Sequence, residues 1–505
     1  MRSILRGLTA SFACFALVFT VGGADGGASC NILDYGADAT GRQWSTPAIQ
    51  KAIDACNRAG GGNVIFPRGR FRSNYLELKS NVTLQFEPES FLVAPLTYGE
   101  YAPFKSLIRA NHAEHVGLRG PGVIVGQGAR FWNLVPNPTT WHTAPNERPS
   151  PLVQFKYCRD VTVDGITITN APSWTLSPWG CTNVTIRNVT IRNDIYGPNT
   201  DGIDLCQCQD VVVSDCRIVT GDDAIVIKNK SEIPAENVSR NITVTRCYLT
   251  TPSYALKIGT ESRVGIFENI SWTDCRTYAG TVAWGMHSPL AIESVDGATI
   301  RHVRVARITC DGARSPIFIR LGNRGTGQTT SPPRPGSIQD VVIEDVSTTP
   351  NVGDREFGIQ IHGVRDGTLA NIILRRISMA SRGGVTHRHL NVSDVADLTV
   401  PEKEERYPSV DMFGWIPAHG IYCRHVQGLT LENIDLQLAA TDVRPALVLD
   451  DVRDVTVRQL QVVHPGIEMR SGASLHRIVN SPGVQLSPRA KTAAAKPGWV
   501  LSNAE

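Results

Sequence analysis

The sequence predicts an all-β fold: a single-stranded parallel β-helix, a solenoid of about ten coils with an N-terminal capping helix. Three observations predict it. Short runs of β-branched residues recur from about residue 150, and equivalent points lie about 23 to 35 residues apart. Within each run, apolar and polar residues alternate with the period of two that strands require. Helix-forming segments are nearly absent from the repeats, which disfavours helical solenoids.

The repeats themselves define the coils. Clear copies span 160–169, 183–192, 210–218 and 241–249, and further copies start at Asn269, His302, Asp340, Leu369, Leu429 and Asp454. One such unit cannot bury its apolar face alone, so neighbouring units must stack. In a parallel β-helix the stacked strands lie roughly 4.8 Å apart.

The two ends of the chain differ from the repeats. Basic residues Arg2 and Arg6, an apolar run over 8–21 and small residues up to Ser29 predict a signal peptide over 1–28, hence an extracellular or periplasmic protein. A membrane anchor is the alternative, but the run is short for the roughly 20 apolar residues of a span. We expect the β-helix domain over 29–485 and a disordered tail over 486–505.

Two segments interrupt the repeats. The spacing of apolar residues predicts a helix over 46–59, ended by three glycines, which caps the open end of the solenoid. The second interruption, 381–417, is rich in charge and proline. We expect this long loop to form one wall of a cleft, where it could close one end; the sequence leaves its direction open.

The overall composition excludes several functions. The chain has 505 residues, 19% of them charged, and a net charge of only +3. A nucleic-acid-binding protein would show a basic patch or stripe. No further segment is long and apolar enough for a membrane span, and no nucleotide-binding or zinc-protease motif occurs. We expect a monomer that binds neither nucleic acid nor membrane.

The cysteines predict buried thiols rather than a metal site. Without Cys14 of the signal peptide, 11 of the 12 cysteines remain. Cys30 and Cys56 flank the first strand and helix and could form a disulfide in an oxidising compartment. Cysteines at similar points of successive repeats predict a column of buried thiols acting as small hydrophobes; they are Cys216, Cys247, Cys275 and Cys310.

Three aspartates carry the functional information. Asp201 lies in Asn-Thr-Asp-Gly-Ile-Asp (199–204), and Asp222 and Asp223 lie in Gly-Asp-Asp-Ala-Ile (221–225). In a chain of this period, the 21-residue spacing stacks one site above the other. Crowded carboxylates raise the pKa of one of them, which can then act as general acid while its neighbours activate water. This is the chemistry of glycosidic hydrolysis, with inversion if water attacks from the opposite face.

Two other functions remain open. Three carboxylates also suit a Ca²⁺ site, as in a β-helix polysaccharide lyase of the pectate-lyase kind. A β-helix that binds glycans without cutting them, an adhesin for example, is the third possibility. Unsaturated products abolished by a chelator would favour the lyase, and binding without turnover would favour the adhesin.

The residues resemble glycoside hydrolase family 28, the polygalacturonase group, from about Asn31 to about Val462. The likeness rests on the Asn-Thr-Asp and Gly-Asp-Asp motifs, on Gly126-Gln-Gly128 with Trp132, on 170–174, and on the opening segment 34–67. The resemblance implies a right-handed parallel β-helix that hydrolyses pectic polysaccharides or oligosaccharides with no metal or other cofactor. By position, Asp222 would be the general acid, Asp201 and Asp223 would activate the water, and Asn199 would orient the group.

The chain departs from two motifs of the family. Tyr254 stands where the histidine of a Gly-His-Gly motif is expected, and the Arg-Ile-Lys triplet that holds the substrate carboxylate has no counterpart near His287. We expect a replacement subsite, together with Tyr254, from Lys257, Glu261, Arg320, Asn323 and Arg324. Residues after the long loop could also approach the cleft, namely His419, Tyr422, Arg424 and His425. Candidate platforms for sugar stacking are Trp174, Trp179 and Trp284.

Overall fold

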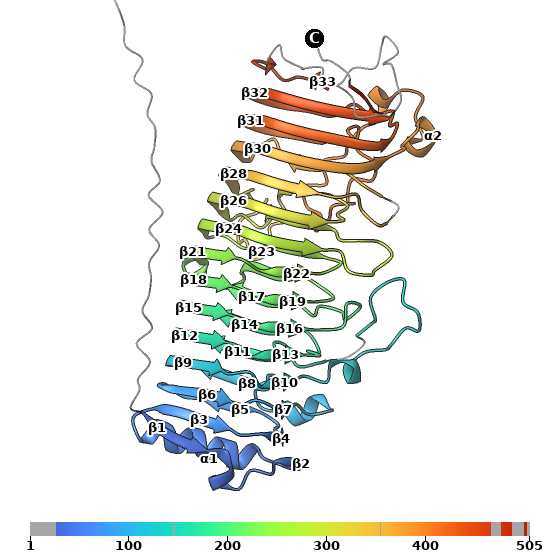
Figure 1. Ribbon diagram of the computed structural model, residues 1–505. Coiled ribbons are helices and arrows are strands. Elements are labelled where there is room, and N and C mark those ends of the chain that lie inside the picture. Colours follow the sequence, from blue (N-terminus) through green and yellow to red (C-terminus); the bar gives the residue numbers. More distant parts are fainter. Residues whose placement is uncertain (1–26, 145–146, 354, 466–475, 487–498, 502–505) are drawn as a thin grey trace, which may run out of the picture.

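The computed structural model describes residues 27–144, 147–353, 355–465, 476–486 and 499–501. The predicted signal peptide and the predicted tail therefore lie almost wholly outside the described residues. What is described forms one tall stack of coils (Figure 1), and the strands of successive coils pair in parallel, as predicted.

Three stacks of strands form the walls of the solenoid. The first contains β1 (Ala28–Asn31), β3 (Gly62–Phe66), β6 (Val82–Phe86), β9 (Glu114–Arg119), β12 (Arg159–Asp164), β15 (Thr182–Arg187), β18 (Gln209–Ser214) and β21 (Val238–Thr245). The second contains β2 (Thr40–Trp44), β4 (Gly69–Arg72), β7 (Ser90–Val93), β10 (Val123–Val125), β13 (Thr167–Thr169), β16 (Thr190–Arg192), β19 (Arg217–Val219) and β22 (Tyr248–Thr250). These two stacks continue as single bent strands, β24 (Ile266–Tyr278), β26 (Thr299–Asp311), β28 (Ser337–Thr348) and β30 (Thr368–Gly383).

The third stack carries the functional site. It contains β5 (Leu76–Leu78), β8 (Ile108–Asn111), β11 (Val153–Lys156), β14 (Leu176–Trp179), β17 (Ile203–Cys206), β20 (Ile225–Asn229), β23 (Tyr254–Ser262), β25 (Ser288–Ser294), β27 (Phe318–Leu321) and β29 (Ile359–His362). All three stacks end in β31 (Ile421–Ala440) and β32 (Leu447–Pro465), which β33 (His476–Val479) and β34 (Gln485–Leu486) follow. The pairing of β35 (Trp499–Leu501) with β32 is antiparallel.

Asparagine and aspartate at the strand starts have a backbone reason. Asp160, Asn183, Asp210 and Asn241 all adopt φ between +55° and +57°. These residues tolerate the left-handed region better than most side chains do. The bend at this corner therefore recurs in every coil, which keeps the register of the stack constant.

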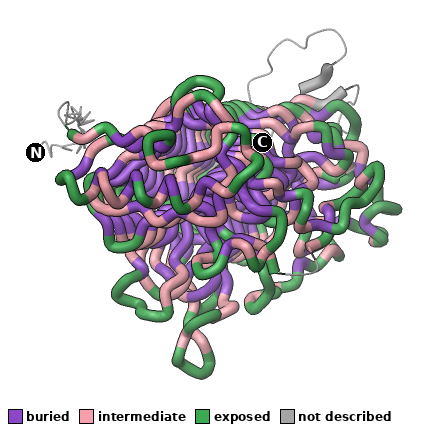
Figure 2. Tube along the Cα trace, turned by 90° about the horizontal axis from the view of Figure 1, so that it is seen from below, coloured by how far each residue is buried: buried purple, intermediate pink, exposed green. Residues whose placement is uncertain are grey.

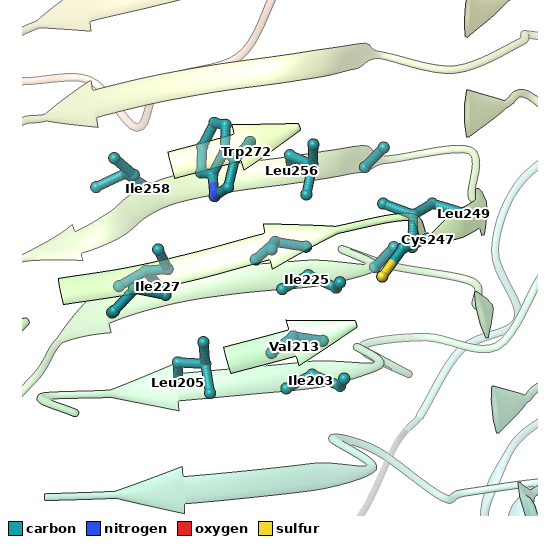
Figure 3. Close-up of a cluster of buried hydrophobic side chains, with 14 of the residues drawn as sticks. Ile203, Leu205, Val213, Ile225, Ile227, Cys247, Leu249, Leu256, Ile258 and Trp272 are labelled. Carbon is teal, nitrogen blue, oxygen red and sulfur yellow. The ribbon is translucent and has the colours of Figure 1, made fainter. Parts of the chain in front are cut away.

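The core lies inside the coils, as the alternation predicts. Figure 2 shows the buried chain enclosed by exposed loops, and Figure 3 shows inward side chains of consecutive strands in columns. Ile203 and Ile225 form part of one column, and Leu205, Ile227 and Ile258 form another. All of them are at most 1% exposed. The side chains that alternate with them along the strands, such as Asp204 and Lys228, must therefore face outward.

Helix α1 (Thr46–Arg58) is the predicted cap. Its buried residues Ala48, Ile49, Ala52, Ile53 and Cys56 are the predicted ones, and it packs on β1, β3 and β5 at one end of the stack. The other helical segments are α2 (His387–Leu390) and the short 3-10 helices η1 (Ile32–Tyr35), η2 (Tyr98–Tyr101), η3 (Gly128–Phe131), η4 (Pro234–Glu236) and η5 (Val395–Asp397). Within the described ranges, none of these helices has the length and apolar content of a membrane span.

The thiol column is confirmed for three of the four cysteines. Cys247 contacts both Cys216 and Cys275. Cys310 is buried too but pairs with Thr277, because the register places it two residues beyond the column. Cys30 and Cys56, which could form a disulfide, lie next to each other and are free thiols in this structure. The Cys56 thiol donates instead to the backbone oxygen of Ala28, at 3.7 Å.

The predicted long loop connects β30 to β31 and covers the outer face of the third stack. We call residues 384–420 the insertion. Its apolar residues Val400, Val410, Phe413, Ile416 and Ala418 pack on outward side chains of the stack, which are Tyr254, Ala291, Phe318, Tyr422 and Val448. The insertion therefore hides this face from β25 to β32, which decides the direction that the sequence left open.

Candidate active site

The three aspartates meet because their coils are in register. Ile203 of β17 pairs with Ile225 of β20, which pairs with Leu256 of β23. Two residues upstream, Asp201, Asp223 and Tyr254 occupy equivalent points of consecutive coils. A backbone hydrogen bond of 2.9 Å from the Gly202 amide to the Asp223 oxygen joins the first two coils. The predicted stacking is thus present, with Asp223 rather than Asp222 directly above Asp201.

The turn before β20 lets Asp222 and Asp223 point differently. The hydroxyls of Thr220 and Thr251 both donate to the backbone oxygen of Asp222, at 2.6 Å each. A side-chain carbon at Gly221 would lie 2.3 Å from the backbone oxygen of Gly197, so only glycine allows this turn to rest on the coil below. The turn leaves Asp222 at the surface of a pocket and Asp223 buried beneath it.

The partners of the three carboxylates differ. Asp223 Oδ2 lies 3.2 Å from Lys257 Nζ, and its Oδ1 accepts from the Ser253 hydroxyl at 2.9 Å. Asp201 Oδ2 lies 3.1 Å from Lys228 Nζ. Asp222 Oδ2 accepts from Asn199 Nδ2 at 3.3 Å, and its Oδ1 accepts from the Asp223 amide at 2.9 Å. Among the described residues, the hydrogen-bond donors to Asp222 are therefore neutral amides.

A pocket of about 330 Å³ opens above this group. That volume is within the usual range for a small-molecule site. The lining residues come from six separate segments of the chain: Trp141, Pro198, Asn199, Asp222, Ser253, Tyr254, Lys257, His287, Tyr407, Pro408 and Ser409. The last three belong to the insertion, so the predicted wall of the cleft is present.

The environment of the pocket shifts the pKa values of Asp222 and His287 in opposite directions. Burial, together with the charges of Asp201 and Asp223, raises the pKa of Asp222 well above its usual range. Burial lowers the pKa of His287 to about 4, and the charge of Arg314 adds to this effect, so the imidazole is neutral near pH 7. Asp222 is therefore suited to hold a proton at a pH where an ordinary aspartate is ionised.

Arg148 is a cation at the rim of the site. Its Nη2 donates to Asn199 Oδ1 at 2.6 Å, while its Nη1 is buried and has no hydrogen-bond partner among the described residues. Desolvation lowers the pKa of Arg148, against the attraction of Asp201 and Asp222. A guanidinium with an unused donor beside a pocket can bind an anionic group.

The sequence predicted part of this set. Asn199, Tyr254 and Lys257 line the pocket with Asp222. Glu261 does not: it lies 3.7 Å from Lys230. Burial would raise the pKa of Glu261, but Lys228 and Lys230 outweigh this effect and lower it to about 2.

The predicted role of Arg320 and Asn323 in a replacement subsite receives no support from their positions. Arg320 Nη2 donates to the backbone oxygens of Glu402 and Lys403, at 2.9 and 3.1 Å, and so anchors the insertion. Asn323 donates to the backbone oxygen of Pro333 at 3.0 Å. Both side chains lie outside the pocket lining because the insertion covers the coils to which they belong.

The remaining candidate residues contact the insertion or side chains close to it. Arg324 pairs with Asp296, and Arg424 pairs with Glu402 at 2.7 Å. The hydroxyl of Tyr422 lies 3.2 Å from Asp450, and His425 contacts Glu402 and Asp451. His419 lies at a smaller cavity beside Trp415 and Arg444. None of these side chains is among those that line the 330 Å³ pocket.

The rings of the three tryptophans predicted to stack on sugars are in contact with other side chains of the protein. Lys228 Nζ lies 3.7 Å from the ring centre of Trp174, and Lys156 Nζ lies 5.6 Å from that of Trp179. Trp284 contacts Trp141, with ring centres 5.1 Å apart, and so stands behind the pocket wall. Trp141 is the tryptophan that lines the pocket.

The sequence reasoning missed several residues of the site. Trp141, Arg148 and Tyr407 lie in long connections, where no periodicity indicates which way a side chain points. Lys228 could have been found from the sequence: it directly follows the apolar run Ile225–Ile227 and shares the outward phase of Val226. A charge at such a position calls for a buried partner.

The three aspartates Asp201, Asp222 and Asp223, which we call the trio, are poorly arranged for a metal ion. Lysine ammonium groups already contact Asp201 and Asp223. Within the described part of the chain, no three His, Cys, Asp or Glu side chains are grouped to hold a metal.

Comparison with known proteins agrees with this geometry. The profile of glycosyl hydrolases family 28 matches residues 56–396. A protein of Arabidopsis thaliana described as a probable polygalacturonase is 26% identical over 404 residues, which cover 76% of this chain and 83% of that protein. One of Vitis vinifera with the same description is 27% identical over 222 residues, which cover 40% of this chain and only 44% of that protein.

Among solved structures, the family 28 exopolygalacturonase of Yersinia enterocolitica superimposes with a TM-score of 0.60 at 17% identity. The match covers 91% of this chain and 77% of that one. At this identity the likeness concerns the fold, which it establishes as a parallel β-helix of the same type.

Proposed function

This chain belongs to glycosyl hydrolases family 28, and on that premise we propose that it hydrolyses glycosidic bonds of a pectic polysaccharide or oligosaccharide. The observation that carries the proposal is the grouping of Asp201, Asp222 and Asp223 on consecutive coils, where Asp222 lines the pocket and the other two are buried beneath it. Among the described residues, lysines contact Asp201 and Asp223, and the hydrogen-bond partner of the Asp222 Oδ2 atom is the neutral amide of Asn199. The pectic substrate is supported by the descriptions of the relatives as polygalacturonases.

Each aspartate has a role in the proposed reaction. The carboxyl of Asp222 gives its proton to the glycosidic oxygen as the bond from the anomeric carbon to that oxygen breaks. Asp201 and Asp223, as carboxylates, take a proton from a water whose oxygen forms the new bond from the opposite face, which inverts the configuration. One water is consumed and two hydroxyl groups form. Proton exchange with solvent then restores the three carboxyl groups.

Arg148 supports an acidic substrate. Asp201, Asp222 and Asp223 would repel a uronate, and the lysines nearby are already paired with carboxylates. Arg148 retains an unused donor next to Asn199. We propose that Arg148 binds the substrate carboxylate, in place of the missing Arg-Ile-Lys triplet. Arg148 reaches the site through Asn199, which lines the pocket, and Lys257 is the lysine among the lining residues.

The insertion supports cleavage near a chain end. Because residues 384–420 cover the outer face from β25 to β32, a polymer lying along the third stack can extend only towards β14 and β11. Tyr407 and Ser409 of the insertion line the pocket. Short products released from one end of the polymer are expected, rather than random internal cuts.

Secretion remains part of the proposal. It is supported by the basic, apolar and small-residue segments of 1–28 and by a substrate that belongs outside the cell.

A reducing-sugar assay tests the function. The wild type and Asp222→Asn would be compared on homogalacturonan, rhamnogalacturonan and a neutral glycan, each with and without chelator. Release of reducing ends that resists the chelator and is lost in the variant supports hydrolysis. Unsaturated products that disappear with chelator would instead reveal an eliminase, and binding of homogalacturonan without any release would reveal an adhesin.

A further inference from the structure

Two buried lysines divide the three aspartates into two kinds. Lys228 Nζ lies 3.1 Å from Asp201, and Lys257 Nζ lies 3.2 Å from Asp223. Asp222 lies between Asp201 and Asp223 in the sequence, and it accepts hydrogen bonds from the side-chain amide of Asn199 and the backbone amide of Asp223. Both lysine side chains are at most 5% exposed, so water screens these contacts little.

Lys228 is held in place from three directions. Its Nζ also contacts Asp204 Oδ1 at 2.7 Å, and it lies 3.7 Å from the ring centre of Trp174. Burial alone would discharge this amine, but Asp204 and Asp201 outweigh burial and raise its pKa well above the usual range. The ammonium group is therefore a fixed positive charge at Asp201, where it opposes the rise in the pKa of Asp201 that burial causes.

Lys257 is shared between Asp223 and Glu293. The distance to Glu293 Oε2 is 3.8 Å, longer than the 3.2 Å to Asp223, and the ring centre of Tyr254 lies 4.3 Å away. Burial raises the pKa of Glu293 to about 7. Below that pH Glu293 is mostly neutral, so that the charge of Lys257 acts chiefly on Asp223.

We propose that Lys228 and Lys257 are positioning residues that keep Asp201 and Asp223 ionised and thereby leave the catalytic proton on Asp222. This inference rests on the hydrolase function proposed above and explains how three neighbouring aspartates acquire different roles. A cation next to a carboxylate favours its charged form, and two fixed carboxylates then favour the neutral form of the third.

Other charged groups facing the trio must be included in this balance. Asp204 on β17 and Glu293 on β25 compete for the two lysines. Arg148 attracts Asp201 and Asp222 from the β10–β11 connection, and Tyr254, His287 and Tyr407 face Asp223 or Lys257. His287 is neutral above about pH 4, and the pKa of Tyr254 is raised well above its usual range by burial. Between pH 5 and 9 the two lysines are thus the fixed cations in contact with the trio.

The test is the pH profile of kcat/KM for Lys257→Met, Lys228→Met and the corresponding arginine variants. Removing either lysine should raise the pKa of the aspartate that it contacts. The acidic limb of the kcat/KM profile should therefore move to higher pH by about 1 to 3 units. Activity at pH 5 should then fall at least tenfold and recover as the pH rises. The arginine variants should return the limb towards its original position. Lys230→Met is the matched control, since Lys230 lies 4.4 Å from the Trp174 ring centre but contacts Glu261 rather than the trio.

A second readout does not depend on activity or on the stability of the lysine variants. Carboxyl ¹³C signals of aspartate-labelled wild type would be titrated, and Asp201→Asn, Asp222→Asn and Asp223→Asn would identify the three signals. The proposal requires Asp222 to be the last of the three to ionise. It is overturned if Asp201 or Asp223 holds the proton, or if the lysine variants lose activity equally at every pH without a shift of the limb. A wild type that cuts no glycan yet shows the expected titration would refute the function alone.

Discussion

Asn199 Nδ2 donates a 3.3 Å hydrogen bond to Asp222 Oδ2, although the two residues belong to consecutive coils. Arg148 fixes the orientation of that amide, because its Nη2 donates to Asn199 Oδ1 at 2.6 Å. The amide nitrogen must then face Asp222. Arg148, Asn199 and Asp222 thus form one chain of hydrogen bonds. This chain connects the proposed binding of the substrate carboxylate to the group that holds the catalytic proton.

Asp222→Asn should lower kcat by about two to four orders of magnitude with little change in KM, because a general acid contributes that much to the transition state. Initial rates on the best pectic substrate measure this. Asp215→Asn is the matched control, since Asp215 pairs with Arg246 on the outer surface. A variant of Asp222 that kept a tenth of the activity would refute the assigned role.

Arg148→Gln should raise KM for acidic oligosaccharides about tenfold or more, because it removes a charge-assisted contact to the substrate carboxylate. KM for methyl-esterified oligosaccharides should change little, while kcat should fall moderately on both because Asn199 loses its partner. Steady-state kinetics on the two substrates separate these effects. Arg130→Gln changes an exposed arginine of the same connection and should leave both constants unchanged. Equal KM changes on both substrates would argue against a carboxylate contact.

Phe413→Ala should lower the free energy of unfolding by about 3 to 5 kcal/mol, as expected for a large buried aromatic residue. Phe413 is 7% exposed, its ring centre lies 4.0 Å from that of His362, and Arg320 lies 5.3 Å from it. Chemical denaturation measures the change, with Val352→Ala at a 60% exposed position as control. A loss below about 1 kcal/mol would mean that the insertion is loosely attached, and chain-end cleavage would lose its support.

Glu293→Gln should flatten the pH dependence of stability between about pH 5 and 7. Burial raises the pKa of Glu293 from 4.5 to about 7, so the folded protein binds this proton more tightly than the unfolded chain. The resulting stabilisation is complete below pH 4.5 and is lost as the pH rises through 7, a change of about 3 kcal/mol at 1.36 kcal/mol per pKa unit. Unfolding free energies measured at several pH values test this, with the exposed Glu114→Gln as control. An unchanged slope in Glu293→Gln would show that Glu293 does not hold a proton in the folded state.

The sequence was informative for features that repeat from one coil to the next. Period-two alternation predicted which residues of β17, β20 and β23 face the core, and the repeat length predicted that Asp201 and the Asp222–Asp223 pair meet. Helical periodicity predicted the cap over 46–59, and the helix spans Thr46–Arg58. The misplacement of Cys310 is an error of register, because a shift of two residues changes no pattern in the sequence.

By itself, the sequence determined the β-helix and the column of aspartates, since both depend on contacts between neighbouring coils that a short repeat fixes locally. Only the tertiary structure decided which cations reach that column and which end of the cleft is closed. Lys228 contacts Asp204 one coil away, but Arg148 reaches Asn199 across 51 residues, and Arg320 holds Glu402 across 82. Such contacts depend on how long connections fold back on the solenoid, where packing rather than periodicity sets the direction of each side chain.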